Sequence, residues 1–290
     1  NFDGLHRGHQ QIFQQLRQQG EVLGLPVVVI FFEPQPAEFF APQRAEPRIT
    51  RLRDKLQLLS EQPVDFACCL RFNQQLAQMP AQEFVSRVLV AGVGVRHLVV
   101  GPDFRFGAQR RGDYELLSRS GEEHGFTVVA VEPFDVAGER VSSTRVRIAL
   151  QKGAFAEVSE MLGRPYSLGG VVRQGDRIGR TIGFPTVNLA LSSRADCLNG
   201  VYAVKLSGGG LVSHPGVANI GTRPTVEGSR RVLEVHLLDY QGDLYGERVR
   251  VEFVHWLRAE QKFSSLEKLK EQIRRDGQTA RNFFSNADQD

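Results

Sequence analysis

Two different patterns of apolar residues divide this chain, and they meet between Met161 and Tyr166. Before that boundary, segments with helical spacing alternate with short β-branched runs, and the unit recurs about four times. The run Pro26–Phe32 is apolar throughout, which is typical of a strand buried on both faces. Such alternation favours βα units, so the first half is predicted to be an α/β domain with a parallel sheet.

The elements of the first half follow from these spacings. We expect the first helix over His9–Gln19, with its end at Gly20. A second helix, capped by Thr50, is expected to carry an apolar stripe of Leu52, Leu56 and Leu59. Two further helices are predicted to open at Pro80 and to cover 114–123, and strands are predicted at 26–32, 66–70, 97–100 and 126–131.

After the boundary, strand-like stretches are separated by glycine-rich turns, and few helical periods occur between them. This pattern predicts an antiparallel β-barrel. A helix returns near the end, where Ser264 or Ser265 can cap it and Gly277 is expected to follow it. We therefore predict domains of residues 1–162 and 163–290. Because the chain opens at Asn1 on a turn-like sequence, the first domain is expected to lack its first strand.

Composition excludes several classes of protein. Apolar residues make up 41% and charged residues 24%, as in ordinary globular domains. The apolar runs are far shorter than a membrane span, so we expect a soluble, cytoplasmic protein with no membrane partner. Its three cysteines fit neither a disulfide framework nor a metal pair. The net charge of +3 suits a small anionic ligand. The short arginine pairs are interpreted as a solvated face, so no nucleic-acid partner is expected.

The densest chemical feature is the segment Asn1–His9, in which a turn with Gly4 leads into a helix that carries His6 and His9 in its first turn. Residues three apart share one side of a helix. The N-terminus of a helix binds anions, and Gly8 would let a phosphate approach the backbone. His6 and His9 could stabilise charge on a phosphate during group transfer. The alternative is a pair of surface or capping histidines.

Two weaker motifs follow. Ser143 and Thr144 stand at an expected helix start and Arg147 in its first turns, so hydroxyl and guanidinium groups could grip a polyphosphate. A plain helix cap is the alternative. Asp103, Phe104 and Phe106 follow a predicted strand, at the sheet edge where α/β folds place their ligands.

At these separations the three motifs resemble the adenylyltransferase half of the bacterial bifunctional riboflavin kinase/FMN adenylyltransferase family, also called FAD synthetases. The resemblance implies a Rossmann-like nucleotidyltransferase fold. It also implies that His6, Gly8, His9, Ser143, Thr144 and Arg147 bind ATP, and that Asp103, Phe104 and Phe106 lie against the flavin.

The resemblance continues into the second half, where residues 170–188 are similar to the glycine-rich loop and Pro-Thr-Ala-Asn motif of the kinase half. Val187 stands where the family usually has Ala. Segments 216–225, 233–237 and 257–263 also resemble that family. The resemblance implies a riboflavin kinase barrel in which Glu234 is the base for the riboflavin 5′-hydroxyl. Mg²⁺ and ATP would be held by Gly175, Gly179, Arg180, Thr186 and Asn188, with Thr186 and Asn188 offering the hard oxygens that Mg²⁺ prefers.

These implications have alternatives. The glycine-rich loop could be a run of barrel turns, and Glu234 could be a solvent-facing strand residue between Leu233 and Val235. The whole chain could also be another nucleotidyltransferase fused to a barrel, or a flavin-binding regulatory protein without turnover. We expect a two-step enzyme that converts riboflavin to FMN and FMN to FAD, and we make no prediction about an oligomer.

Overall fold

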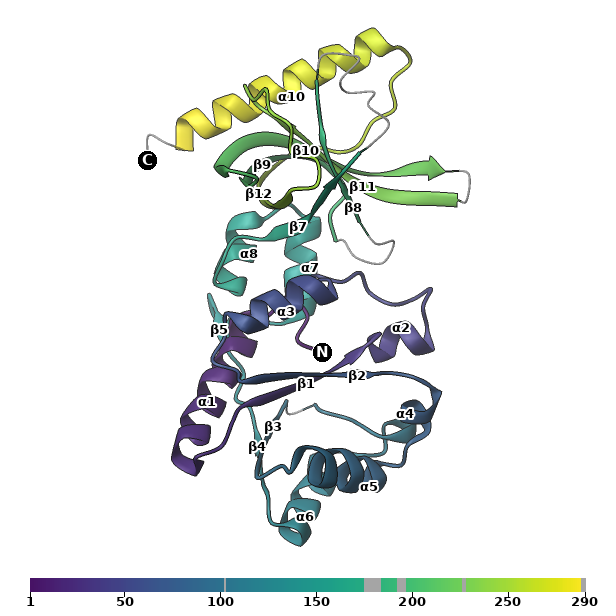
Figure 1. Cartoon of the computed structure of the whole chain (residues 1–290), viewed down its shortest axis with the longest axis vertical. Helices are drawn as coiled ribbons and strands as arrows, with labels where there is room; N and C mark the ends of the chain where they lie inside the picture. The colour runs from purple at the N-terminus through teal and green to yellow at the C-terminus, as the bar shows by residue number, and fades with distance from the viewer. Residues whose placement is uncertain (102, 175–183, 192–196, 226–227, 288–290) are drawn as a thin grey trace. The chain divides into compact units, whose positions relative to one another are not determined.

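The structure is a computed structural model that describes residues 1–101, 103–174, 184–191, 197–225 and 228–287 (Figure 1). The chain forms two compact units. One unit consists of Asn1–Glu46 and Lys55–Ser142, and the other of Pro47–Asp54 and Ser143–Asp290. The short segment Pro47–Asp54 thus packs with the second half of the chain.

The four longer strands of the first unit form two parallel pairs, in agreement with the predicted parallel sheet. β1 (Val28–Glu33) pairs with β2 (Phe66–Arg71), and β3 (His97–Val100) pairs with β4 (Thr127–Ala130). A small antiparallel hairpin, β5 (Asp135–Val136) and β6 (Glu139–Arg140), follows. The helices and helical turns are α1 (Arg7–Leu23), α2 (Pro36–Phe40), α3 (Leu52–Ser60, which spans the division between the units), α4 (Gln74–Gln78), α5 (Ala81–Glu83), the π-helix η1 (Phe84–Val93), the 3₁₀ turn η2 (Ala108–Arg110) and α6 (Tyr114–His124).

Helix α1 continues past the predicted end at Gly20 and stops at Gly24, which adopts the left-handed conformation with φ 65°. After Gly24 the chain folds back, and the Leu25 amide donates to the Gly20 carbonyl at 2.8 Å. A Cβ on Gly20 would lie 2.8 Å from the Leu25 carbonyl oxygen. Gly20 therefore permits this close return, and Gly24 ends the helix.

The buried face of α3 also differs from the prediction. Leu59 is buried as expected, but Leu56 is 41% exposed and Lys55 takes its place on the inner face. Steps of three and four residues both keep side chains on one side of a helix. The set 52, 55 and 59 therefore forms a face just as the set 52, 56 and 59 does. The apolar pattern alone does not separate the two faces.

The second unit is a closed antiparallel barrel whose strands follow the order β10-β11-β8-β7-β12-β9. Helices α7 (Ser143–Gln151) and α8 (Phe155–Leu162) precede the barrel. The strands are β7 (Ser167–Arg173), β8 (Val187–Ala190), β9 (Gly200–Gly208), β10 (Leu211–Thr225), β11 (Gly228–Leu237) and β12 (Arg248–Arg258). The predicted barrel is therefore confirmed. Its strands include the four strand-like stretches 168–172, 201–206, 232–238 and 249–254 of the sequence, and β8 and β10 are additional.

Helix α10 (Leu266–Ala287) runs straight through Gly277, where the sequence predicted its end. Beyond that glycine, Ala280, Phe283 and Phe284 pack on Ala203, Leu238 and their apolar neighbours of the barrel. This burial outweighs the cost of about 1 kcal/mol that a glycine imposes inside a helix.

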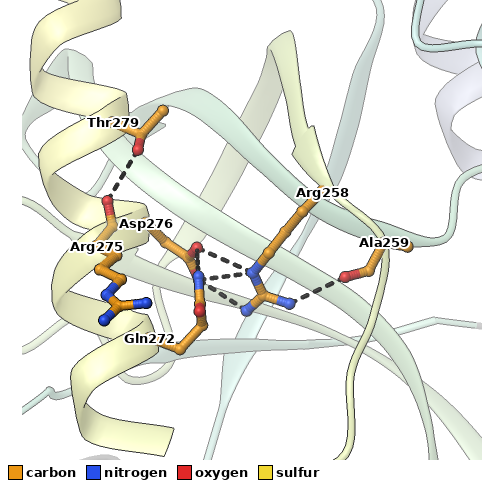
Figure 2. A network of polar contacts seen from close by, with 6 residues as sticks. All are labelled: Arg258, Ala259, Gln272, Arg275, Asp276 and Thr279. Atoms are coloured by element: carbon orange, nitrogen blue, oxygen red, sulfur yellow. Dashed lines mark hydrogen bonds and ion pairs between the residues drawn. The ribbon is translucent and has the colours of Figure 1, made fainter. Parts of the chain in front are cut away.

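An ion pair fastens α10 to the last barrel strand (Figure 2). The Arg258 Nε and Nη2 atoms donate to the two carboxylate oxygens of Asp276 at 2.9 and 2.7 Å. Gln272 donates to the same carboxylate at 2.8 Å, and Arg258 Nη1 donates to the Ala259 carbonyl at 2.9 Å. Because both charged side chains are largely buried, this network fixes the position of the helix on the barrel.

Within the part of the chain that the structure describes, no helix is both long and apolar enough to cross a membrane.

Candidate active sites

The start of α1 offers backbone donors to a ligand. His6 is the residue that caps this helix, and its carbonyl accepts from the amides of His9 and Gln10 at 2.8 and 3.1 Å. The amides of Arg7 and Gly8 precede these bonds and have no acceptor within the helix, and this end of the helix carries the positive end of its dipole. This end of α1 is therefore suited to an anion such as a phosphate.

The two predicted histidines lie together at this helix end. Their rings stack with centroids 3.6 Å apart and an angle of 19° between planes. The Phe2 ring meets His9 edge-on at 5.1 Å. Gly8 has a specific part in this arrangement, because a Cβ there would lie 3.2 Å from His6 Nδ1. The glycine makes room for the His6 ring, and the structure thus brings His6, Gly8 and His9 together.

Burial holds the pKa of His9 well below its usual value, and the neighbouring His6 and the positive charge of Lys55 lower it further. His9 is accordingly neutral at physiological pH. Its Nδ1 atom is buried, and none of the described residues provides it with a hydrogen-bond partner. A neutral imidazole in this position can donate one hydrogen bond and accept another.

Lys55 is a charged residue of this region that the sequence interpretation missed. Its side chain is fully buried, and Nζ donates to the Asn1 carbonyl at 2.8 Å. The one sequence signal that could have found it is its spacing from Leu52 and Leu59, which puts a cation on an apolar helix stripe.

The three predicted flavin contacts lie in different surroundings. Asp103 is exposed and lies 3.8 Å from the Arg140 guanidinium. Phe106 is buried in the apolar core of the first unit, and the half-buried Phe104 stacks on it with centroids 5.6 Å apart. Phe104 is therefore the ring with free surface, and Phe106 supports it.

Ser143, Thr144 and Arg147 lie on the first turns of α7, which belongs to the second compact unit. Thr144 is exposed and Ser143 is half-buried. Arg147 is largely buried, and its Nε donates to the Pro47 carbonyl at 2.8 Å. Ser143 and Thr144 thus begin the helix, as the sequence predicted, and Arg147 follows one turn later.

In the barrel, three polar residues form a row across neighbouring strands. Glu234 of β11 lies directly opposite Asn188 of β8 on one side and Asn219 of β10 on the other. Their chain neighbours, such as Leu233 and Val235, are fully buried in the barrel. Directly paired residues point to the same face of a sheet, so Glu234, Asn188 and Asn219 share the outer face. Glu234 is half-buried there.

Thr186 contacts Asn188, a member of this row. The Asn188 side-chain amide donates to the Thr186 carbonyl at 3.1 Å and to its hydroxyl at 3.3 Å. Both residues line a pocket of about 50 Å³. The segment between β11 and β12 also lines the pocket, with Tyr240, Asp243 and Tyr245 among its residues. The sequence interpretation did not find these three residues, because the segment has the composition of an ordinary turn.

The remaining predicted residues of the kinase loop, Gly175, Gly179 and Arg180, lie outside the described residues. Across the described part of the chain, no group of three or more His, Cys, Asp or Glu side chains could hold a metal ion. The Thr186 hydroxyl and the Asn188 side-chain carbonyl are hard oxygen donors, which suit Mg²⁺ when phosphates complete the coordination. The residues present therefore fit a magnesium–nucleotide complex better than a metal bound by protein alone.

Comparisons with known proteins agree with this division into two sites. The family model described as FAD synthetase matches residues 1–145, and the one described as riboflavin kinase matches residues 162–284. A protein of Escherichia coli (strain K12), described as bifunctional riboflavin kinase/FMN adenylyltransferase, is 50% identical over 284 residues, covering 98% of this chain and 91% of the relative. A protein of Pseudomonas fluorescens with the same description is 49% identical, covering 97% and 90%.

Among solved structures, a protein of Streptococcus pneumoniae described as a macrolide-efflux protein is similar with a TM-score of 0.79 and 31% sequence identity. The similarity covers 97% of this chain and 92% of that one, so both folds recur together in one chain.

Proposed function

Because this chain belongs to the family of bifunctional riboflavin kinase/FMN adenylyltransferases, we propose that its two sites carry out the two steps of FAD synthesis separately. The barrel phosphorylates riboflavin to FMN with ATP. The N-terminal nucleotidyltransferase domain joins FMN to the AMP part of ATP and releases pyrophosphate. The observation that carries the assignment of residues is the row of Asn188, Glu234 and Asn219 beside the Thr186 pocket.

In the kinase step, Glu234 accepts the proton of the riboflavin 5′-hydroxyl as its oxygen attacks the γ-phosphorus of ATP. The bond to the β,γ-bridging oxygen breaks, and ADP leaves. Glu234 suits this part because it is half-buried on the face that also carries Asn188. A general base of this kind contributes about 10²- to 10⁴-fold to the rate.

Thr186 and Asn188 would hold Mg²⁺ through their side-chain oxygens. The ion, when bound, would neutralise charge on the ATP phosphates. Because Asn188 donates its amide hydrogens to Thr186, its carbonyl oxygen is the atom left for the ion. Gly175, Gly179 and Arg180 would bind the same nucleotide, an expectation that rests on the family resemblance alone.

In the adenylylation step, an oxygen of the FMN phosphate attacks the α-phosphorus of ATP, and pyrophosphate leaves. His6, His9 and the first amides of α1 would stabilise the charge on the ATP phosphates. Gly8 leaves room for the His6 ring and would let a phosphate approach the backbone. Phe104, supported by Phe106, would stack on the flavin with Asp103 nearby. Ser143, Thr144 and Arg147 would hold the pyrophosphate.

We also place the enzyme in the cytoplasm, with flavins and ATP as its small-molecule partners and with no nucleic-acid or membrane partner. The free thiols of Cys68, Cys69 and Cys197 support a reducing compartment.

The test is to incubate the purified protein with riboflavin, ATP and MgCl₂ and to separate FMN and FAD by chromatography. Thr186→Val removes the hydroxyl while it retains the shape, so FMN formation should fall by about 10-fold or more. The control Thr186→Ser keeps the hydroxyl and should keep most of the activity. Both variants should still convert supplied FMN to FAD. Normal FMN formation by Thr186→Val would contradict the assignment of the Mg²⁺ ligands, and no FMN or FAD from the wild type would contradict the function.

A further inference from the structure

The least expected side chain of the first unit is Lys55 of α3. It has no exposed surface, and its Nζ atom contacts the Asn1 carbonyl at 2.8 Å and lies 5.2 Å from the centre of the Phe31 ring. Lysines are almost never fully buried unless a partner compensates the charge, because removing an ammonium group from water is costly. A leucine at position 55 would continue the apolar face of α3 without the cost of burying a charge.

The surroundings of Lys55 place it between the sheet and the nucleotide site. Phe31 pairs with Cys69 across β1 and β2, so the amine lies over this pair of strands. The positive charge also acts on His9, as one of the causes of its lowered pKa. Lys55 therefore connects the strand pair to the start of α1.

The contact with Asn1 holds a turn with an unusual backbone. Phe2, Gly4 and Leu5 all have positive φ angles, of 50°, 83° and 42°. Residues other than glycine rarely adopt a positive φ angle, so surrounding contacts must hold the backbone of this turn. Phe2 in turn packs on His9 at 5.1 Å. A displacement of Asn1 would therefore be transmitted to the His9 ring.

We propose that Lys55 is a positioning residue of the adenylyltransferase site. Its ammonium group fixes the turn before α1 through the Asn1 carbonyl, and it places a buried positive charge beside the two histidines. The proposal rests on the proposed function of His6 and His9. Lys55 itself is fully buried and acts on the ATP phosphates through these residues.

The proposal has a consequence for pH dependence. The groups that act on His9 are the stacked His6 and Lys55, and the buried Asp3 lies in the turn before α1. Removal of the Lys55 charge takes away one cause of the low pKa of His9. The pKa should then rise, and protonation should inactivate the site at a higher pH than in the wild type.

The experiment compares Lys55→Met, which keeps the length but not the charge, with Lys55→Arg in the full chain. We expect kcat/KM for FAD formation from FMN to fall by about 10- to 100-fold in Lys55→Met, because small misplacements of reacting groups cost this much. The acid limb of the pH profile should move to higher pH. NMR titration of ¹³C-labelled histidines should show the same shift for His9 without any substrate. Lys55→Arg should keep more activity and the wild-type acid limb.

Two controls separate this inference from general damage. Leu59→Ala removes a buried side chain one turn further along α3 and should lower the melting temperature without moving the acid limb. FMN formation in the same chain reports an intact barrel. Should Lys55→Met not fold, Lys55→Gln carries the test, because it can keep the donor without the charge.

An unchanged kcat/KM with an unchanged acid limb would overturn the proposal. The proposal would also be overturned if Leu59→Ala lowered kcat/KM as much as Lys55→Met does and the titration of His9 were unchanged in Lys55→Met. If the wild type itself made no FAD from FMN, the proposed function would fail, and that result is distinct from a failure of the Lys55 variants.

Discussion

The Arg258–Asp276 ion pair allows a quantitative test of how α10 is held on the barrel (Figure 2). The two side chains are only 17% and 7% exposed, and the guanidinium bonds both carboxylate oxygens. Asp276→Ala would leave a mostly buried guanidinium, which keeps its bond to the Ala259 carbonyl. Breaking a buried pair in this way costs about 3–5 kcal/mol. Since water still reaches part of Arg258, we expect a loss of about 3 kcal/mol in the free energy of unfolding.

The assay is urea unfolding followed by tryptophan fluorescence. Trp256 is the only tryptophan in the chain, and it lies on β12 two residues before Arg258, so it reports on the barrel. A double-mutant cycle with Arg258→Ala should give a coupling of about 2–3 kcal/mol, because the second substitution removes the group that the first left unpaired.

The matched control is Glu271→Ala on the same helix. Glu271 pairs with Arg275 at 2.5 Å, but these side chains are 58% and 67% exposed. Exposed pairs of this kind contribute about 0.3–0.5 kcal/mol, so the control should change little. A loss in Asp276→Ala no larger than that of Glu271→Ala would refute the argument that burial gives the Arg258–Asp276 pair its strength.

The remaining predictions concern the two sites. Glu234→Gln should lower FMN formation by about 10²- to 10⁴-fold and leave the conversion of supplied FMN to FAD intact, as measured by chromatography; normal kinase turnover would remove Glu234 from the mechanism. His9→Asn should lower FAD formation by about 10²-fold or more and spare FMN formation, and an equal loss of both products would contradict separate sites. Because folding lowers the pKa of His9, the unfolded chain binds a proton below about pH 6.5 that the folded chain does not. The stability of the first unit should therefore fall as the pH drops below that value, and the slope of melting temperature against pH should be smaller in His9→Asn.

The order of helices and parallel strands in the first unit could be predicted because apolar periodicity records which face is buried. The exact ends could not. The end of α1 depends on the fold-back at Leu25, and the continuation of α10 past Gly277 depends on contacts with the barrel. Both are tertiary effects, which outweigh the local preference of a single glycine.

The sequence pattern did not predict the strand β10 because of its composition. Its fifteen residues include Pro215, Gly216, Gly221 and Pro224, which read as turns in the sequence. Proline has no amide hydrogen to donate to a neighbouring strand, so it is found in a sheet at edges and irregularities. Pro215 follows such an irregularity, the register shift between Leu211 and His214 in the pairing of β10 with β9. Strands with such residues depend on their neighbours in the barrel, and this information is not local.

Two glycines show that the sequence can locate a candidate site without showing what the glycine does there. The sequence predicts that Gly8 lets a phosphate approach the backbone, and the structure adds that a Cβ on Gly8 would lie 3.2 Å from His6 Nδ1. At Gly221 of β10, the Glu260 carboxylate lies so close that any side chain would collide with it. Gly221 is a diagonal neighbour of Glu234, on the same outer face of the barrel, since it lies opposite Val232. In both sites the missing side chain therefore makes room for a polar group of the protein itself, and this follows only from the packing.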